Sequence, residues 1–143
     1  MTAVEYLKQS FYINKEIDEN IMQLEEIDSD ICRCTQVFTD MPPGTHNENN
    51  VEIKLAAYLD KRVELTQKIN EETDKLFDIK NEIRLRIYRI KNPKYRLILM
   101  KRYIRFKKWE QIQEELGYKE LKSVYNVHKK AMGEFIKLYG NNF

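Results

Sequence analysis

Apolar side chains recur at steps of three and four over two long stretches of this chain, at about residues 2–38 and 51–91. This spacing is typical of helices that bury one face. Helices of such length are not maintained by propensity alone, so each apolar stripe needs a partner. The segment between them, residues 40–50, holds two prolines, a glycine and a polar cluster, which predict a loop. Residues 1–91 are therefore expected to form a long antiparallel helical hairpin, or coiled coil.

The composition agrees with an all-α fold. The chain has 143 residues, of which 34% are charged, and it contains only four glycines and three prolines. These values favour long exposed helices over a sheet, and no alternating segment of useful length is present. Several apolar side chains lie outside the narrow stripes of the hairpin and also need to be buried against a partner. We therefore expect the hairpin to be an oligomerisation region, with a homodimer through it, or to pack on the C-terminal part.

The C-terminal part, residues 92–143, reads as a small separate domain of short helices. Asn92 and Pro93 form a helix start, because Asn caps the helix and Pro suits its first position. The second helix is predicted over 109–116 and ends at Gly117, where a left-handed backbone closes a helix. The third is expected over about 120–138, with one apolar and one polar, basic face. Helix, glycine turn and helix with a basic outer face are typical of a helix-turn-helix that reads DNA.

The residues of this segment resemble the DNA-binding end of sigma factors (region 4). The similarity lies in the runs Arg96–Leu99, Trp109–Ile112 and Leu116–Tyr118, followed by Val124–Tyr125 and His128. More closely, the chain resembles phage and prophage late-transcription regulators of the ArpU/RinA type, which carry a sigma-like end behind a long helical half. Gln113 and Lys119 depart from the sigma pattern, which has a small residue and a Ser or Thr cap there. The resemblance implies control of late phage genes and contact with RNA polymerase.

Charge is divided sharply along the chain. Residues 1–82 carry 18 acidic and 9 basic side chains, whereas residues 83–143 carry 5 acidic and 16 basic ones. Between Arg84 and Lys108 there are eleven Lys or Arg and no Asp or Glu. Such asymmetry indicates a polyanion bound by one half, although a basic run alone is more often a solvated surface or pairs with the acidic half of the same chain. Beside a helix-turn-helix pattern, it favours double-stranded DNA as the partner.

The expected recognition helix supplies the candidate DNA contacts. Its first turns lie deepest in the major groove, so their polar residues are predicted to contact bases: Lys122, Ser123, Tyr125 and Asn126. Basic residues around them are predicted to contact phosphates: Arg102, Arg105, Lys107, Lys108, Lys119, Lys129 and Lys130. Trp109 and His128 fall on apolar faces and are expected to be packed side chains rather than a base platform and a catalyst.

Other kinds of protein find little support in the residues. No glycine-rich phosphate loop and no recognisable nucleophile–histidine motif is present, so no enzyme is expected and no cofactor. Cys32 and Cys34 lie two apart on a predicted helix and read as reduced thiols rather than a metal site. No segment approaches the apolar length of a membrane span, and the chain is expected in the bacterial host cytoplasm, associated with the nucleoid.

Two alternatives to a transcription regulator stay open. A phage small terminase subunit, which takes part in DNA packaging, also combines a helix-turn-helix with a helical oligomerisation region. A helical interaction protein that binds no DNA would use the same motif only for packing. A ring of subunits would favour the terminase, and failure to bind any duplex would favour the interaction protein.

Overall fold

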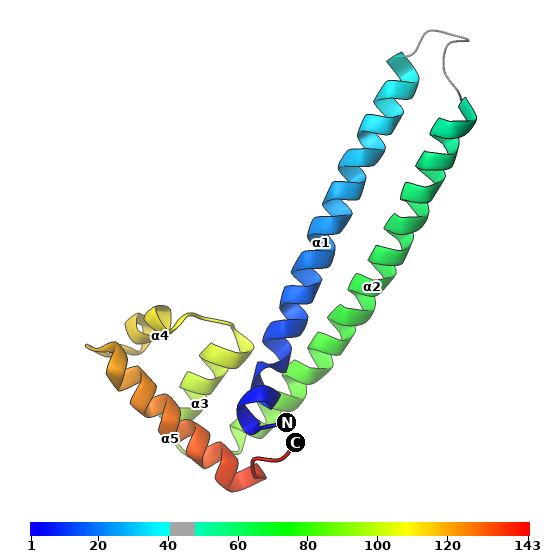
Figure 1. Cartoon of the computed structure of the whole chain (residues 1–143). Helices are drawn as coiled ribbons and strands as arrows, with labels where there is room; N and C mark the ends of the chain where they lie inside the picture. The colour runs from blue at the N-terminus through cyan, green and yellow to red at the C-terminus, as the bar shows by residue number, and fades with distance from the viewer. Residues whose placement is uncertain (41–47) are drawn as a thin grey trace. The chain divides into compact units, whose positions relative to one another are not determined.

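The computed structural model describes residues 1–40 and 48–143, and the side chains of residues 1–37 and 50–143. In this part of the chain all regular structure is helical, as expected. The elements are α1 (Ala3–Asp40), α2 (Glu48–Tyr88), α3 (Pro93–Leu99), the π-helix η1 (Met100–Ile104), α4 (Trp109–Leu116) and α5 (Leu121–Tyr139) (Figure 1). None of these helices is both long and apolar enough to cross a membrane.

The long first helix pairs with the second, as the sequence predicts (Figure 1). The predicted loop at residues 40–50 is too long, because Asp40 still belongs to α1 and residues 48–50 belong to α2. Residues 41–47 lie outside the described part of the chain. At its other end α2 stops at Tyr88 rather than at Lys91. Pro93 disfavours helical backbone at the residue before it. Just past the end of α2 the backbone hydrogen bonds span three residues instead of four, as in the bond from the Ile90 amide to the Ile87 carbonyl.

Packing divides the chain into two compact units, which we call the basic unit and the acidic unit. The basic unit comprises Met1–Asn14 and Lys75–Phe143, and the acidic unit comprises Lys15–Asp74. The acidic unit carries fifteen Asp or Glu and six Lys or Arg, a net −9, and the remaining residues carry +11. The sequence predicts a domain boundary between residues 91 and 92. That residues 92–143 fold independently of the hairpin stays a prediction. Within the basic unit, the ends of α1 and α2 pack together with α3, η1, α4 and α5.

The core of the basic unit draws residues from every helix that enters it. Leu7 of α1, Ile83 and Ile87 of α2, and Phe135 of α5 belong to one cluster and are fully buried or nearly so. The chain termini are tied to each other here, since the Phe143 amide donates to the Met1 carbonyl at 2.9 Å (Figure 1). The start of α1 is therefore part of the hydrophobic core that holds the C-terminal helices.

In the acidic unit, polar pairs join α1 and α2 in antiparallel register. The Asn20 amide donates to the Glu72 carboxylate at 3.0 Å, and Arg62 Nε lies 2.7 Å from Asp28 Oδ1. A two-helix layer buries few apolar side chains, among them Ile17 and Leu65. Others stay exposed along both helices: Ile21, Met22, Val37, Ile53, Leu59 and Val63. Met22, Ile53 and Val63 belong to the apolar excess that the sequence predicts to need a further partner, whereas Ile21 and Leu59 lie on the stripes that it predicts to be buried.

Candidate nucleic-acid interface

The helix pair at the centre of the candidate site is α4 and α5. At the start of α4 the Gln111 side chain accepts a hydrogen bond from the Lys108 amide at 3.0 Å. At its end Gly117 has φ of 74°, in the left-handed region. The amides of Gly117 and Tyr118 then donate to the carbonyls of Glu114 and Gln113, which is the bond pattern of a Schellman cap. The predicted glycine stop of this helix is confirmed.

The turn between α4 and α5 has a side-chain bond of its own. The Gln113 amide nitrogen donates to the Lys119 carbonyl at 3.2 Å. Gln113 and Lys119 are two of the positions at which the sequence departs from the sigma pattern, and here the Gln113 side chain bonds to the Lys119 backbone. Helix α5 begins directly afterwards at Leu121, with Glu120 in extended backbone before it. The predicted recognition helix thus starts one residue later than expected.

The apolar face of α5 is held in the core of the basic unit. Val124, Ala131 and Phe135 are fully buried, and they share the cluster with Ile112 of α4 and Ile98 of α3. Helix α5 contacts both α3 and α4. Burial of these side chains fixes the rotation of α5 about its axis, and that rotation decides which residues face solvent.

The opposite face of α5 carries the predicted base contacts. Lys122, Tyr125 and Asn126 are exposed, whereas Ser123 is half-buried. Lys122, Asn126 and Lys129 are spaced four and three apart and therefore share one helical face. Within the described residues, the side chains of Lys122 and Asn126 have no hydrogen bond or ion pair to the rest of the chain. Their polar groups are free to contact a ligand.

The predicted phosphate contacts fall into two groups. Arg105, Lys108, Lys119, Lys129 and Lys130 are exposed. Arg102 and Lys107 are half-buried and already have internal partners. The Arg102 guanidinium lies 4.4 Å from the centre of the Trp109 ring and donates to the Lys107 carbonyl at 3.0 Å. The Lys107 ammonium forms an ion pair with Glu115. The structure thus gives Arg102 and Lys107 roles inside the protein, and their phosphate contacts stay predictions.

Aromatic residues join η1, α4 and α5 beneath this surface. The Trp109 ring meets the rings of Tyr125 and His128 edge-on, with centroids 5.5 and 4.7 Å away. His128 Nε2 lies 2.7 Å from the Tyr103 hydroxyl. Trp109 is half-buried against the core, which agrees with the expected packing role.

Burial changes the acid–base behaviour of the pair of Tyr103 and His128. It is the main cause that lowers the pKa of His128 to about 4, with the charge of Arg102 as a second cause. It also raises the pKa of Tyr103 to about 12. At neutral pH both groups are therefore uncharged and can share one hydrogen bond. His128 is a packed, hydrogen-bonded histidine, as predicted.

The π-helix η1 and the turn after it have no counterpart in the sequence expectations. The Arg105 amide donates to the Met100 carbonyl, five residues back, at 3.1 Å. Phe106 follows with φ of 57°, which is rare for a bulky side chain. Its ring lies 5.8 Å from that of Phe11, and the Lys80 ammonium lies 4.5 Å from its centre. These contacts hold the turn that leads into α4.

Comparisons with protein-family models, with curated proteins and with solved structures found no match to this chain.

Proposed function

We propose that this protein is a sequence-specific, double-stranded DNA-binding transcription regulator with a sigma-like helix-turn-helix, of the phage late-gene type. In this proposal α4 and α5 form the motif, and α5 is the recognition helix. The observation that carries it is the division of α5 into a buried apolar face and an exposed face with Lys122, Tyr125 and Asn126. A helix held in this way can enter a major groove with those side chains toward the base edges.

The chemistry of the exposed face suits base recognition. An Asn amide can bond adenine through two hydrogen bonds, and a Lys ammonium suits the acceptors of guanine. Tyr125 can meet a thymine methyl group or a phosphate. The exposed Lys129 and Lys130 on the same helix would contact phosphates, which adds affinity without reading sequence. Asn126 and Lys122 are therefore the residues on which specificity is expected to depend.

The charge of the basic unit supports the same proposal. A net +11 on this unit favours approach to a polyanion. If about six cations contact phosphates, the plot of log affinity against log salt should have a slope of about −5. In this proposal the protein would act in the bacterial cytoplasm on phage promoters. A sigma-like end would also bring it next to RNA polymerase, which co-purification with the host enzyme would test.

The decisive experiment is selection of bound duplexes from a random pool at low and at moderate salt. We expect one enriched motif at both. On that motif Asn126→Ala should weaken binding by about 1–3 kcal/mol, and its preference for an adenine should be lost. Lys137→Ala, an exposed lysine in the last turn of α5, is the matched control and should leave the motif unchanged.

Two other outcomes would point to the alternative functions. Absence of binding to any duplex at low salt would contradict the proposal and favour a helical interaction protein. A ring of many subunits in native mass spectrometry, with little sequence preference, would favour a small terminase subunit.

A further inference from the structure

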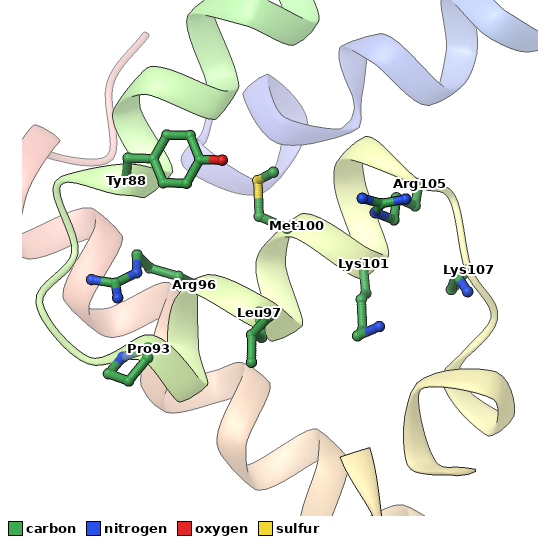
Figure 2. Close-up of a pocket in the computed structure, with 8 residues that line it drawn as sticks. All are labelled: Tyr88, Pro93, Arg96, Leu97, Met100, Lys101, Arg105 and Lys107. Carbon is green, nitrogen blue, oxygen red and sulfur yellow. The ribbon is translucent and has the colours of Figure 1, made fainter. Parts of the chain in front are cut away.

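A pocket of about 430 Å³ opens on the outer face of α3 in the basic unit (Figure 2). Its apolar part comes from the end of α2, from α3 and from η1: Tyr88, Pro93, Leu97 and Met100. Leu97 is 49% exposed and Tyr88 is 58% exposed. Large apolar side chains this open to solvent at a concave site indicate a surface made to be covered.

The rest of the pocket is cationic. Four basic residues line it, and no acidic residue does: Arg96, Lys101, Arg105 and Lys107 (Figure 2). Nearby, Glu115 pairs with Lys101 at 2.7 Å and with Lys107, and Arg96 donates to the carbonyls of Ile90 and Lys91. Arg105 is exposed and, among the described residues, has no side-chain partner. The site therefore combines an apolar floor with a net positive rim.

The matching surface occurs on the acidic unit of the same sequence. Leu59 and Val63 lie four residues apart on α2 and are 46% and 65% exposed. Asp60 and Glu64 follow them directly in the chain, and Lys61 and Arg62 lie between these two carboxylates. Lys61 pairs with Glu64 at 4.0 Å and Arg62 pairs with Asp28 at 2.7 Å, so within the described residues Asp60 is the free carboxylate beside the apolar pair. Residues spaced four apart on one helical face are the usual anchors of a helix that docks in a groove. The whole unit carries a net −9.

We propose that this pocket binds the acidic unit of a second copy of the chain. Leu59 and Val63 of one copy would cover Leu97 and Met100 of the other, with Asp60 near Arg105. The net charges of the whole units, −9 and +11, favour this arrangement, because two acidic units placed face to face would bring −9 against −9. The contact joins two different surfaces and is heterologous. It can be tested without DNA, and it shares Arg105 and Lys107 with the predicted phosphate contacts.

The first test is sedimentation velocity of the full chain over a range of concentrations, at about 50 mM and about 500 mM salt. We expect self-association at low salt that weakens by about tenfold or more at high salt, because the charges are screened. A chain that is monomeric up to about 200 μM at low salt would overturn the proposal. So would association that high salt leaves unchanged.

Two variants test the two surfaces separately. The pocket variant, Leu97→Glu with Arg105→Glu, cannot receive the acidic unit. The hairpin variant, Leu59→Lys with Val63→Lys, cannot supply it. We expect each variant alone to lose self-association. An equimolar mixture should recover a one-to-one complex, because each variant keeps the surface that the other lacks.

Recovery in the mixture also shows that both variants are folded, and circular dichroism of each checks helix content. Lys137→Glu, a charge reversal at an exposed site on α5, is the matched control and should associate like the parent chain. Association that the pocket variant retains would show a contact between hairpins and overturn the proposal. A mixture that stays monomeric would overturn it as well.

Discussion

The hydroxyl of Ser10 donates a hydrogen bond to the carbonyl of Tyr103 over 3.0 Å, and Ser10 is fully buried. The bond joins α1 to the π-helix η1, which lies 93 residues later in the chain. A buried carbonyl that loses its donor carries the full cost of its desolvation. A single hydroxyl near the N-terminus thus helps to hold the helix that leads into the candidate DNA-binding motif.

Replacement of Ser10 with Ala should therefore destabilise the protein by about 1–3 kcal/mol. The free energy of unfolding, measured by urea titration, checks this expectation. Ser29→Ala is the control, because Ser29 is exposed on the same helix and should change stability by less than about 0.5 kcal/mol. Equal stability of Ser10→Ala and the parent chain would contradict an energetic role for this bond.

Deletion of residues 1–14 should unfold the C-terminal helices. Leu7 is fully buried in the cluster that contains Phe135, and the Tyr6 ring stacks on that of Phe143 with centroids 4.5 Å apart. The Tyr6 hydroxyl also donates to Glu82 at 2.7 Å. Near-ultraviolet circular dichroism and one-dimensional NMR of a 15–143 fragment would show the loss of fixed side-chain packing. Sharp native-like spectra from that fragment would instead support a boundary near residues 91 and 92.

The sequence predicted those features of the fold that depend on local chemistry. Asn92 caps α3 by accepting from the Lys94 amide at 3.0 Å, and Gly117 ends α4, both as expected. The docking of α1 through Ser10 was not predicted, because a serine in a helix carries no sign of its distant partner. The internal contacts of Arg102 were not predicted, for the same reason. Periodicity located the exposed face of α5, but tertiary packing decided which nearby cations are already engaged.

Gly117 and Gly133, in the segment of α4 and α5, allow the effect of backbone conformation to be separated from that of steric clash. A Cβ added at Gly117 or at Gly133 would meet no atom within 4 Å. Gly117→Ala should still cost about 1–2 kcal/mol, because its φ of 74° is left-handed. Gly133→Ala, inside α5, should stabilise by about 0.5–1 kcal/mol. Thermal unfolding of both variants gives the comparison, and a stabilising Gly117→Ala would be inconsistent with the turn described here.

Stability should fall as the pH is lowered from about 6.5 to about 4, in part because of His128. In the folded protein the pKa of His128 is about 4, below the ordinary 6.5. As the pH falls, His128 therefore takes up a proton in the unfolded chain before it does so in the folded protein. The contribution is fully present above pH 6.5 and is lost as the pH falls through this window. It should amount to about 1–2 kcal/mol, because the side chain is partly open to solvent and screening reduces it.

The difference in unfolding free energy between the parent chain and His128→Gln, followed from pH 7 to pH 4, isolates this contribution from that of the carboxylates. This difference in unfolding free energy should become smaller as the pH falls. An NMR titration of the His128 ring gives the pKa directly. A value near 6.5 would mean that the imidazole is not buried beside Tyr103.

Arg102 and Lys129 should behave differently, although the sequence predicts a phosphate contact for both. Arg102 stacks on Trp109 and donates to the Lys107 carbonyl, so Arg102→Ala should lower the free energy of unfolding by about 1–2 kcal/mol. Lys129 is exposed, and Lys129→Ala should leave stability within about 0.5 kcal/mol. In the proposed DNA complex, Lys129→Ala should instead reduce the salt slope of binding by about 1 for every duplex tested. A selective loss on one sequence would assign Lys129 to base recognition.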